Sequence, residues 1–127
     1  HPDIFNSIIK ELYRVCKNKA LININVPHPR HDDFLNDPTH VRPITVNMLQ
    51  LYDKSLNQEW QKIKAANSPL ALTYKVNFKI KKVRYDLDEK YSVMIKEKKI
   101  TEEDVIIMGE KYNNVFKKIF IQLEAIK

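Results

Sequence analysis

The spacing of apolar residues predicts a helix at the start of the chain and a strand directly after it. Pro2 and Asp3 suit the first turn of a helix, and Lys17-Asn18-Lys19 suits its end. The stretch from Ala20 to Val26 is rich in β-forming residues and predicts a strand that is partly covered on both faces. The apolar positions with helical spacing are Ile4, Phe5, Ile8, Ile9, Leu12 and Val15.

The middle of the chain predicts a long loop followed by a long helix. Pro27 to Pro43 contains four prolines and many polar residues, and a loop of this length is usually functional or disordered. Thr45 is suited to cap a helix that runs to about Ala66. The apolar stripe of that helix is Met48, Leu49, Tyr52, Leu56, Trp60 and Ile63.

The second half predicts a long strand, two helices and a final strand. Apolar and polar residues alternate from near Leu70 past Lys81, which is typical of a strand with one wet face. Asp88 to Glu97 is predicted helical, and Thr101 to Asp104 has the spacing of a capping box for a helix that ends near Tyr112. Apolar and polar residues alternate again from Val115 to Ile126, which predicts the final strand. The order of elements indicates an α/β fold whose last two strands pair antiparallel at an edge.

Composition places limits on function. The chain has 127 residues, 43% of them hydrophobic and 30% charged, which suits one domain with a real core. Its one glycine, Gly109, excludes a P-loop or a G-x-G-x-x-G motif within these residues. Its one cysteine, Cys16, excludes an internal disulfide. The longest apolar runs are far shorter than the ~18 residues needed to span a bilayer, and no segment reads as a signal peptide. We therefore expect a cytoplasmic location, and the initial His1 suggests a fragment or a processed product.

Charge and candidate chemistry are separated along the chain. Residues 1–40 contain all four histidines and equal numbers of acidic and basic residues, so the net charge of +6 comes from the remainder. This distribution favours a site near the front of the chain and a basic surface behind it.

The loop from Pro27 to Pro43 has side chains suited to acid–base chemistry. Its histidines are candidate general bases, and Asp32, Asp33 or Asp37 could orient an imidazole. Arg30 and Arg42 are candidates to bind a carboxylate or phosphate of a substrate. In the alternative interpretation these side chains only form turn and loop hydrogen bonds. The candidate catalytic residues are His28, His31 and His40, and the candidate substrate-binding residues are Arg30, Asp32, Asp37 and Arg42.

Two further interpretations remain open. The same histidines and aspartates are numerous enough to bind Zn²⁺ or another divalent ion in a hydrolase, although their spacing matches no zinc motif. A basic strand could bind the phosphate backbone of a nucleic acid or another acidic partner. Lysines on the face of a strand more often prevent aggregation between strand edges. The basic residues of this strand are Lys75, Lys79, Lys81, Lys82 and Arg84.

Two segments resemble class I S-adenosylmethionine-dependent methyltransferases. The stretch from Ile9 to Lys17, together with the strand that follows, is similar to the family's E-x-x-R-V-L-K-P-G-G helix and strand. Lys17-Asn18-Lys19 stands where the family has its Pro-Gly-Gly turn. The stretch Asp37-Pro38-Thr39-His40-Val41-Arg42 resembles the D-P-T-H-V-R segment that many bacterial members have after their fifth strand. The last two predicted strands resemble the family's sixth and antiparallel seventh strands.

This resemblance implies that residues 1–127 form the C-terminal, acceptor-side half of a Rossmann-like methyltransferase fold, as a single partial domain. It implies S-adenosylmethionine as cofactor, held by a glycine-rich half that has no counterpart here. The implied partners are a methyl acceptor and either the missing N-terminal half or a second copy of the chain. The alternative function is a non-catalytic interaction module that uses the basic strand.

Overall fold

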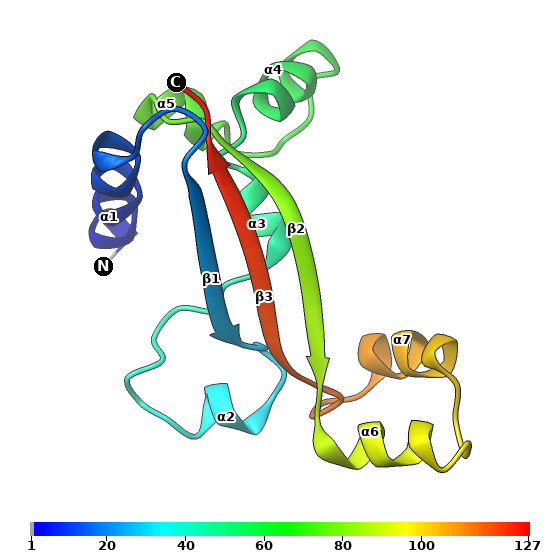
Figure 1. Ribbon diagram of the computed structural model, residues 1–127. Coiled ribbons are helices and arrows are strands. Elements are labelled where there is room, and N and C mark those ends of the chain that lie inside the picture. Colours follow the sequence, from blue (N-terminus) through cyan, green and yellow to red (C-terminus); the bar gives the residue numbers. More distant parts are fainter. Residues whose placement is uncertain (1) are drawn as a thin grey trace. The chain divides into compact units, whose positions relative to one another are not determined.

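The computed structural model describes residues 2–127, and His1 lies outside the described residues. Over this range the chain forms a mixed α/β structure with one sheet of three strands (Figure 1). The elements are α1 (Pro2–Val15), β1 (Leu21–Pro27), α2 (Asp32–Leu35), α3 (Val46–Gln50), α4 (Lys54–Lys62), α5 (Leu70–Tyr74), β2 (Phe78–Leu87), α6 (Glu89–Lys96), α7 (Glu102–Lys111) and β3 (Phe116–Ala125).

The sheet is antiparallel, and its strand order is β1-β3-β2 (Figure 1). On one side of β3 the Ala125 N–H donates to the Ala20 carbonyl at 2.9 Å, and the His28 N–H donates to the Lys117 carbonyl at 2.8 Å. The residue numbers rise along one strand as they fall along the other, which defines antiparallel pairing. The predicted antiparallel pairing of the last two strands is confirmed. However, β3 is the central strand, so β1 and β2 are not neighbours.

Alternation along β3 places its apolar side chains in the core. Ile119, Ile121, Leu123 and Ala125 are all buried, whereas Lys118 is exposed. Because successive side chains in a strand point to opposite faces, this period of two leaves one face apolar and the other polar. The sequence pattern of the final strand is therefore confirmed.

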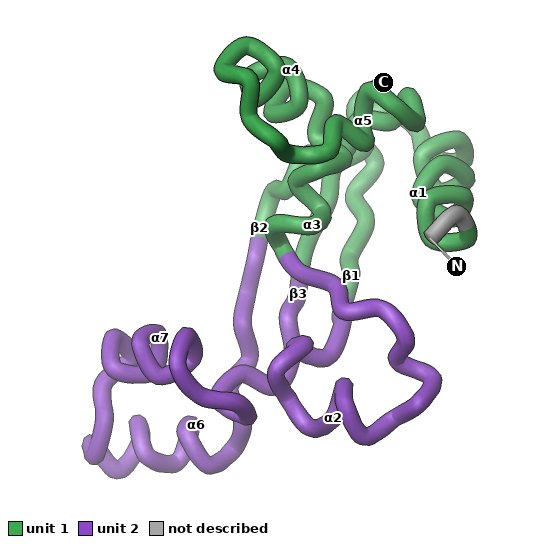
Figure 2. The backbone as a smooth tube through the Cα atoms, turned by 180° about the vertical axis from the view of Figure 1, so that it is seen from behind, with its two compact units in different colours: residues 1–24, 46–82, 121–127 green, residues 25–45, 83–120 purple. Residues whose placement is uncertain are grey.

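The chain divides into two compact units, which are coloured separately in Figure 2. Unit 1 comprises residues 1–24, 46–82 and 121–127, and unit 2 comprises residues 25–45 and 83–120. In unit 1 the Tyr13 ring of α1 meets the Phe78 ring of β2 edge to face, with 5.3 Å between ring centroids. The Tyr13 hydroxyl also donates to the Ile126 carbonyl, so α1 is tied to the chain beyond β3.

The helix predicted from Thr45 to Ala66 is instead two shorter helices, α3 and α4. Asp53 begins α4 by accepting a hydrogen bond from the Leu56 N–H at 3.2 Å, and the Ser55 hydroxyl also donates to its carboxylate. An aspartate in extended backbone conformation that caps a new helix interrupts the preceding one. The apolar spacing alone did not reveal this break.

The strand predicted to begin near Leu70 begins at Phe78, because residues 70–74 form α5. The side chain of Asn57, which is fully buried, accepts hydrogen bonds from the Ala71 and Leu72 N–H groups at 3.0 and 3.3 Å. These bonds satisfy N–H groups at the start of a helix. Lys75 then adopts a left-handed conformation with φ of 57° and ends the helix.

The two predicted helices of the second half are confirmed. Asp88 caps α6, and Thr101 forms a complete capping box with Asp104 at the start of α7. The predicted loop from Pro27 to Pro43 contains the short helix α2. No helix within residues 2–127 has both the length and the apolar character needed to cross a bilayer.

Candidate functional site

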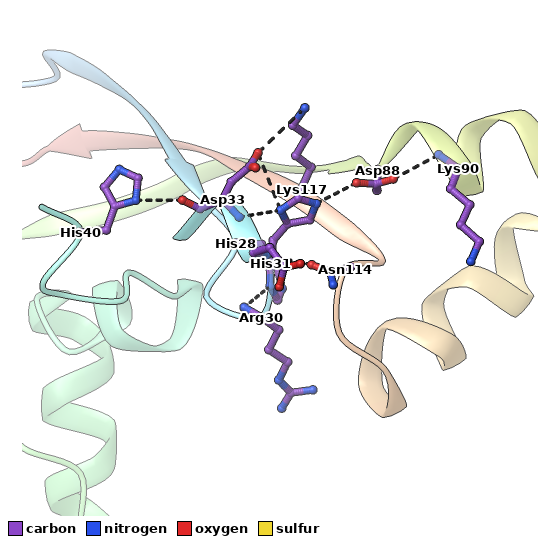
Figure 3. A network of polar contacts seen from close by, with 10 residues as sticks. His28, Arg30, His31, Asp33, His40, Asp88, Lys90, Asn114 and Lys117 are labelled. Atoms are coloured by element: carbon purple, nitrogen blue, oxygen red, sulfur yellow. Dashed lines mark hydrogen bonds and ion pairs between the residues drawn. The ribbon is translucent and has the colours of Figure 1, made fainter. Parts of the chain in front are cut away.

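All the candidate site residues lie in unit 2, on the segment that follows β1. His31 is the most buried of them, with 5% of its surface exposed. Its Nδ1 atom accepts a hydrogen bond from the Asp33 N–H at 3.0 Å, and its Nε2 atom lies 2.8 Å from Asp88 Oδ2 (Figure 3). Because a backbone N–H can only donate, Nδ1 has no proton and Nε2–H donates to the carboxylate. Both nitrogens of His31 are therefore committed to holding the loop.

Asp88 is shared between this loop and α6. One carboxylate oxygen accepts from His31, while the other accepts from the Lys90 N–H at 3.1 Å (Figure 3). The hydrogen bond from His31 and then the bond from the Lys90 backbone lower the pKa of Asp88 below its usual value. The carboxylate is therefore ionised at neutral pH, where it caps α6 and fixes the imidazole at once.

A second set of bonds fastens residues 30–32 to the turn before β3. The Asn114 N–H donates to the Arg30 carbonyl at 2.9 Å, and the Asn114 side-chain oxygen accepts from the Asp32 N–H at 2.8 Å. The Arg30 guanidinium donates to the Glu110 carbonyl at 3.0 Å. Asp32, a predicted substrate-binding residue, is thus held here by its backbone, and Arg30 is held at both its backbone and its side chain.

His28 lies among aromatic side chains. Its Nδ1 atom accepts from the Arg30 N–H at 3.0 Å, and its ring lies 6.1 Å from the rings of both Tyr85 and Phe116. Burial, and then the nearby charge of Arg30, lower the pKa of His28. The ring is therefore neutral at pH 7, and since Nδ1 accepts a hydrogen bond, its single proton is on Nε2.

His40 has the opposite tautomer. Its Nδ1 atom lies 3.1 Å from the Asp33 carbonyl, which can only accept, so Nδ1 carries a proton, and in the neutral form of the ring the lone pair is on Nε2 (Figure 3). Asp37 Oδ2 lies 3.8 Å from that Nε2 atom. The Thr39 hydroxyl and N–H donate to Asp37 and lower its pKa, so a carboxylate stands beside the basic nitrogen. Of the three histidines in the described chain, His40 has the arrangement of a general base.

Four of the seven predicted site residues line two cavities that share no lining residue, whereas His31, Asp32 and Asp37 line neither of them. His40 and Arg42 line a cavity of about 220 Å³, together with Phe34, whose ring stacks on His40 at 5.8 Å. His28 and Arg30 line another cavity, of about 570 Å³. The sequence placed all these residues in one loop but gave no sign of this division.

The two remaining interpretations concern a metal ion and a basic strand. Within residues 2–127 no three side chains of the metal-binding types gather closely enough to hold an ion. In the predicted basic strand, Lys75 belongs to the end of α5, and Lys81 lies 4.0 Å from Glu124. Arg84 bonds Asp86 at 2.8 Å and stacks over the Phe120 ring. Part of the positive charge of this strand is thus already paired within the chain.

Sequence reasoning missed the residues that complete the site from the second half of the chain. These are Tyr85, Asp88, Glu110, Asn114, Phe116 and Lys117. The sequence placed Asp88 at the start of a predicted helix, but no local signal pairs it with a histidine 57 positions earlier. Comparison of the chain with family models, curated proteins and solved structures finds no match.

Proposed function

We propose that the complete protein transfers a methyl group from S-adenosylmethionine to a small acceptor in the cytoplasm. In this proposal the chain supplies the acceptor-side, C-terminal half of a Rossmann-like methyltransferase fold. The observation that supports it is the cavity beside His40, because the six residues that resemble the family's D-P-T-H-V-R segment, Asp37 to Arg42, include four that line it. His40 and Arg42 thus line one cavity where an acceptor would bind, and the Asp37 carboxylate lies 3.8 Å from His40 Nε2.

Each of these side chains has a distinct task in methyl transfer. An acceptor oxygen or nitrogen must lose a proton as it forms its bond to the methyl carbon, and the Nε2 lone pair of His40 receives that proton. Asp37, 3.8 Å away, stabilises the imidazolium that results. Arg42 lines the same cavity and would bind a carboxylate of the acceptor, which fixes the attacking atom.

The residues of this chain do not fit the cofactor itself. The only glycine, Gly109, lies in α7 against the Phe116 ring and not in a turn after a strand. The loop after β1 instead begins with His28 and Pro29, and proline has no N–H to offer a ligand. We therefore assign the methyl donor to residues outside this chain and derive no step from it.

The outer surface of unit 1 is consistent with an additional partner segment. β1 is an edge strand of the described sheet, and Ile4, Ile8 and Val15 expose more than half of their surface along α1. An open strand edge beside exposed apolar side chains is a common site for pairing. We assign this surface to the missing half of the protein. A stable monomer of residues 1–127 at high concentration, measured by size-exclusion chromatography, would contradict both this assignment and pairing between copies.

The proposal is tested in the complete protein with radiolabelled S-adenosylmethionine and a panel of hydroxy acids and amino acids as acceptors. We expect methyl transfer to depend on His40 and Arg42, with a loss of about 10²–10⁴-fold for His40→Ala, the usual contribution of a general base. Arg14→Ala, on exposed α1 of unit 1, is the matched control for removing an arginine. Failure of the complete protein to bind S-adenosylmethionine would refute the function, while full activity of both variants would refute the site.

The alternative, binding of an acidic partner or nucleic acid by the basic strand, makes a different prediction. Contacts between lysines and phosphates release counterions, so affinity for a DNA duplex would fall steeply between 50 and 200 mM salt. Lys79 and Lys82 are exposed on β2 and are the residues to replace by alanine. Binding that survives these replacements, or that does not change with salt, excludes this alternative.

A further inference from the structure

The larger cavity of unit 2 is not used by the function proposed above. It has a volume of about 570 Å³, within the range of small-molecule sites. Three rings form one wall: Tyr85 and Phe116 lie 5.4 Å apart, and His28 lies 6.1 Å from each. Ile106 and Ile119 add aliphatic surface. The rings are tilted by 32° to 56° to one another, so they form an angled apolar surface that suits a small apolar molecule.

Of the three rings that line the cavity, the imidazole of His28 has its tautomer fixed by a hydrogen bond. Since Nδ1 of His28 accepts from the Arg30 N–H at 3.0 Å, the proton of the neutral ring is on Nε2. A ring held in this way donates one hydrogen bond in a constant direction. The complementary group on a ligand is an oxygen that accepts, such as a carbonyl.

The charges around the cavity argue against an anionic ligand. One arginine and one glutamate line it, and the Arg30 guanidinium already donates to the Glu110 carbonyl at 3.0 Å. By contrast, a cleft of about 600 Å³ in unit 1 is lined by Lys10, Lys75 and Lys127. The cavity of unit 2 contains no lysine among its lining residues, so an uncharged ligand suits it better.

The single glycine of the chain forms part of this cavity. A Cβ atom at Gly109 would lie 2.2 Å from Cε2 of Phe116 and 2.8 Å from its Cδ2 atom. The close approach of α7 to the ring thus requires glycine at this position. Even so, Ile106 on the same helix is 61% exposed and Tyr85 is 44% exposed, so the packing of α7 leaves apolar surface open at the cavity.

We infer that this cavity binds a small, uncharged aromatic compound that bears one hydrogen-bond acceptor. Its ring packs on Tyr85 and Phe116, and its oxygen accepts from Nε2 of His28. A second cavity of about 330 Å³ is also lined by Tyr85, Ile106 and Phe116. The site is independent of the His40 cavity and of methyl transfer.

The test uses the whole 127-residue chain, labelled with ¹⁵N, and 2-acetylnaphthalene as the probe. Because Gly109 is the only glycine, labelling with ¹⁵N-glycine makes its amide the expected single resonance in a ¹H–¹⁵N spectrum. We expect that resonance to move on titration. We expect 2-ethylnaphthalene, which lacks the oxygen, to bind about tenfold more weakly because one hydrogen bond is lost.

Variants separate this site from general hydrophobic adsorption. His28→Leu should reduce binding of the ketone to the level of 2-ethylnaphthalene, whereas His28→Gln keeps an N–H donor near the Nε2 position and should restore part of it. Ile107→Ala, on an exposed position of α7 that does not line the cavity, is the control and should leave binding unchanged.

Several results would overturn the inference. These are equal affinity for the two probes, tighter binding of the anion 2-naphthoate, and an undisturbed Gly109 resonance at the solubility limit of the ketone. A shift of that resonance with protein concentration alone would also overturn it, because a second copy would then occupy the cavity. None of these results depends on S-adenosylmethionine, so the inference and the proposed function can fail separately.

Discussion

Unit 1 and unit 2 share the three strands of one sheet, yet unit 1 buries more apolar side chains than unit 2. In the described part of unit 1 the buried polar residues are Asp53 and Asn57, and the buried apolar residues are Ile9, Leu49, Tyr52, Ala71, Val76, Phe78, Ile121, Leu123 and Ala125. In unit 2 the buried apolar residues are Val105, Val115 and Ile119, and the buried polar residue is His31. Its loops are instead held by hydrogen bonds among His31, Asp88 and Asn114.

This difference indicates that unit 1 mainly stabilises the fold and that unit 2 mainly positions polar side chains. Burial of apolar surface is the main source of stability in a small domain, so unit 1 is expected to contribute most of the free energy of unfolding. Hydrogen-bonded loops with few buried side chains contribute less stability but fix side chains in defined directions. Unit 2 is thus the part of the chain where ligand binding and proton transfer are expected.

The largest expected effect is on the core of unit 1. Phe78 is 1% exposed and meets the Tyr13 ring edge to face, so Phe78→Ala should lower the free energy of unfolding by about 3–5 kcal/mol. Urea unfolding followed by circular dichroism measures this change. Ile106→Ala on exposed α7 of unit 2 is the comparison and should cost less than about 1 kcal/mol. Equal losses for the two variants would remove the distinction between the units.

The next effect concerns Gly109, where replacement by alanine should lower the free energy of unfolding, although the same replacement inside a helix normally raises it. Glycine to alanine inside a helix normally stabilises a protein by about 1 kcal/mol. Here the added methyl would overlap the Phe116 ring, so Gly109→Ala should destabilise by about 1–3 kcal/mol in urea unfolding. In a Phe116→Leu background the ring is gone and the same substitution should cost far less. Two additive losses would show that the close approach does not matter.

The histidines of unit 2 should differ in their effect on stability. His31→Ala removes a bond to an ionised carboxylate and a helix cap, and should cost about 1–3 kcal/mol. His40→Ala removes one bond at a partly exposed position and should cost less than about 1 kcal/mol. Thermal unfolding of the two variants side by side checks the ranking. The reverse ranking would contradict the positioning role of His31.

The smallest effects should appear as a dependence of stability on pH. The pKa of His28 is lowered in the folded chain, so below its usual value near 6.5 the unfolded chain binds more protons and stability falls with falling pH. The pKa of Asp88 is also lowered, so its contribution is present above the usual aspartate value of about 3.9 and is lost as pH falls through the folded value.

These two pH windows are separable by mutation. His28→Gln should flatten the upper part of a plot of urea midpoint against pH, and Asp88→Asn should flatten the lower part. Lys79→Ala, which alters an exposed strand position of unit 1, serves as the control and should leave the shape of the curve unchanged. A profile of Asp88→Asn that matches the unmodified chain would mean that the His31–Asp88 bond does not form in solution.

Elements with strong local signals could be predicted from the sequence. The alternation of β3 and the capping box of α7 are properties of neighbouring residues, and both are confirmed. Elements that depend on contacts with residues far away in the sequence could not be predicted in this way. α5 begins where it does because Asn57 bonds the Ala71 and Leu72 N–H groups, and the predicted strand is helical there for that reason.

The candidate site shows the same limit. The sequence marked the loop from Pro27 to Pro43 as the place for chemistry, since its histidines and arginines are dense there. It could not distinguish His31 from His40, because the difference is made by partners elsewhere. Asp88 engages one nitrogen of His31, and the Asp33 carbonyl fixes the tautomer of His40.

The sequence by itself thus determined the alternation of the last strand, the two helices of the second half, the position of the polar loop and the single glycine. Only the tertiary structure decided which strand is central, how the loop divides over two cavities and why the glycine stands at position 109. The physical reason is the distance along the sequence between the groups that interact. Helix caps and alternating burial act between neighbours in the chain, whereas strand order, tautomers and the contact of Gly109 with Phe116 depend on groups that folding brings together.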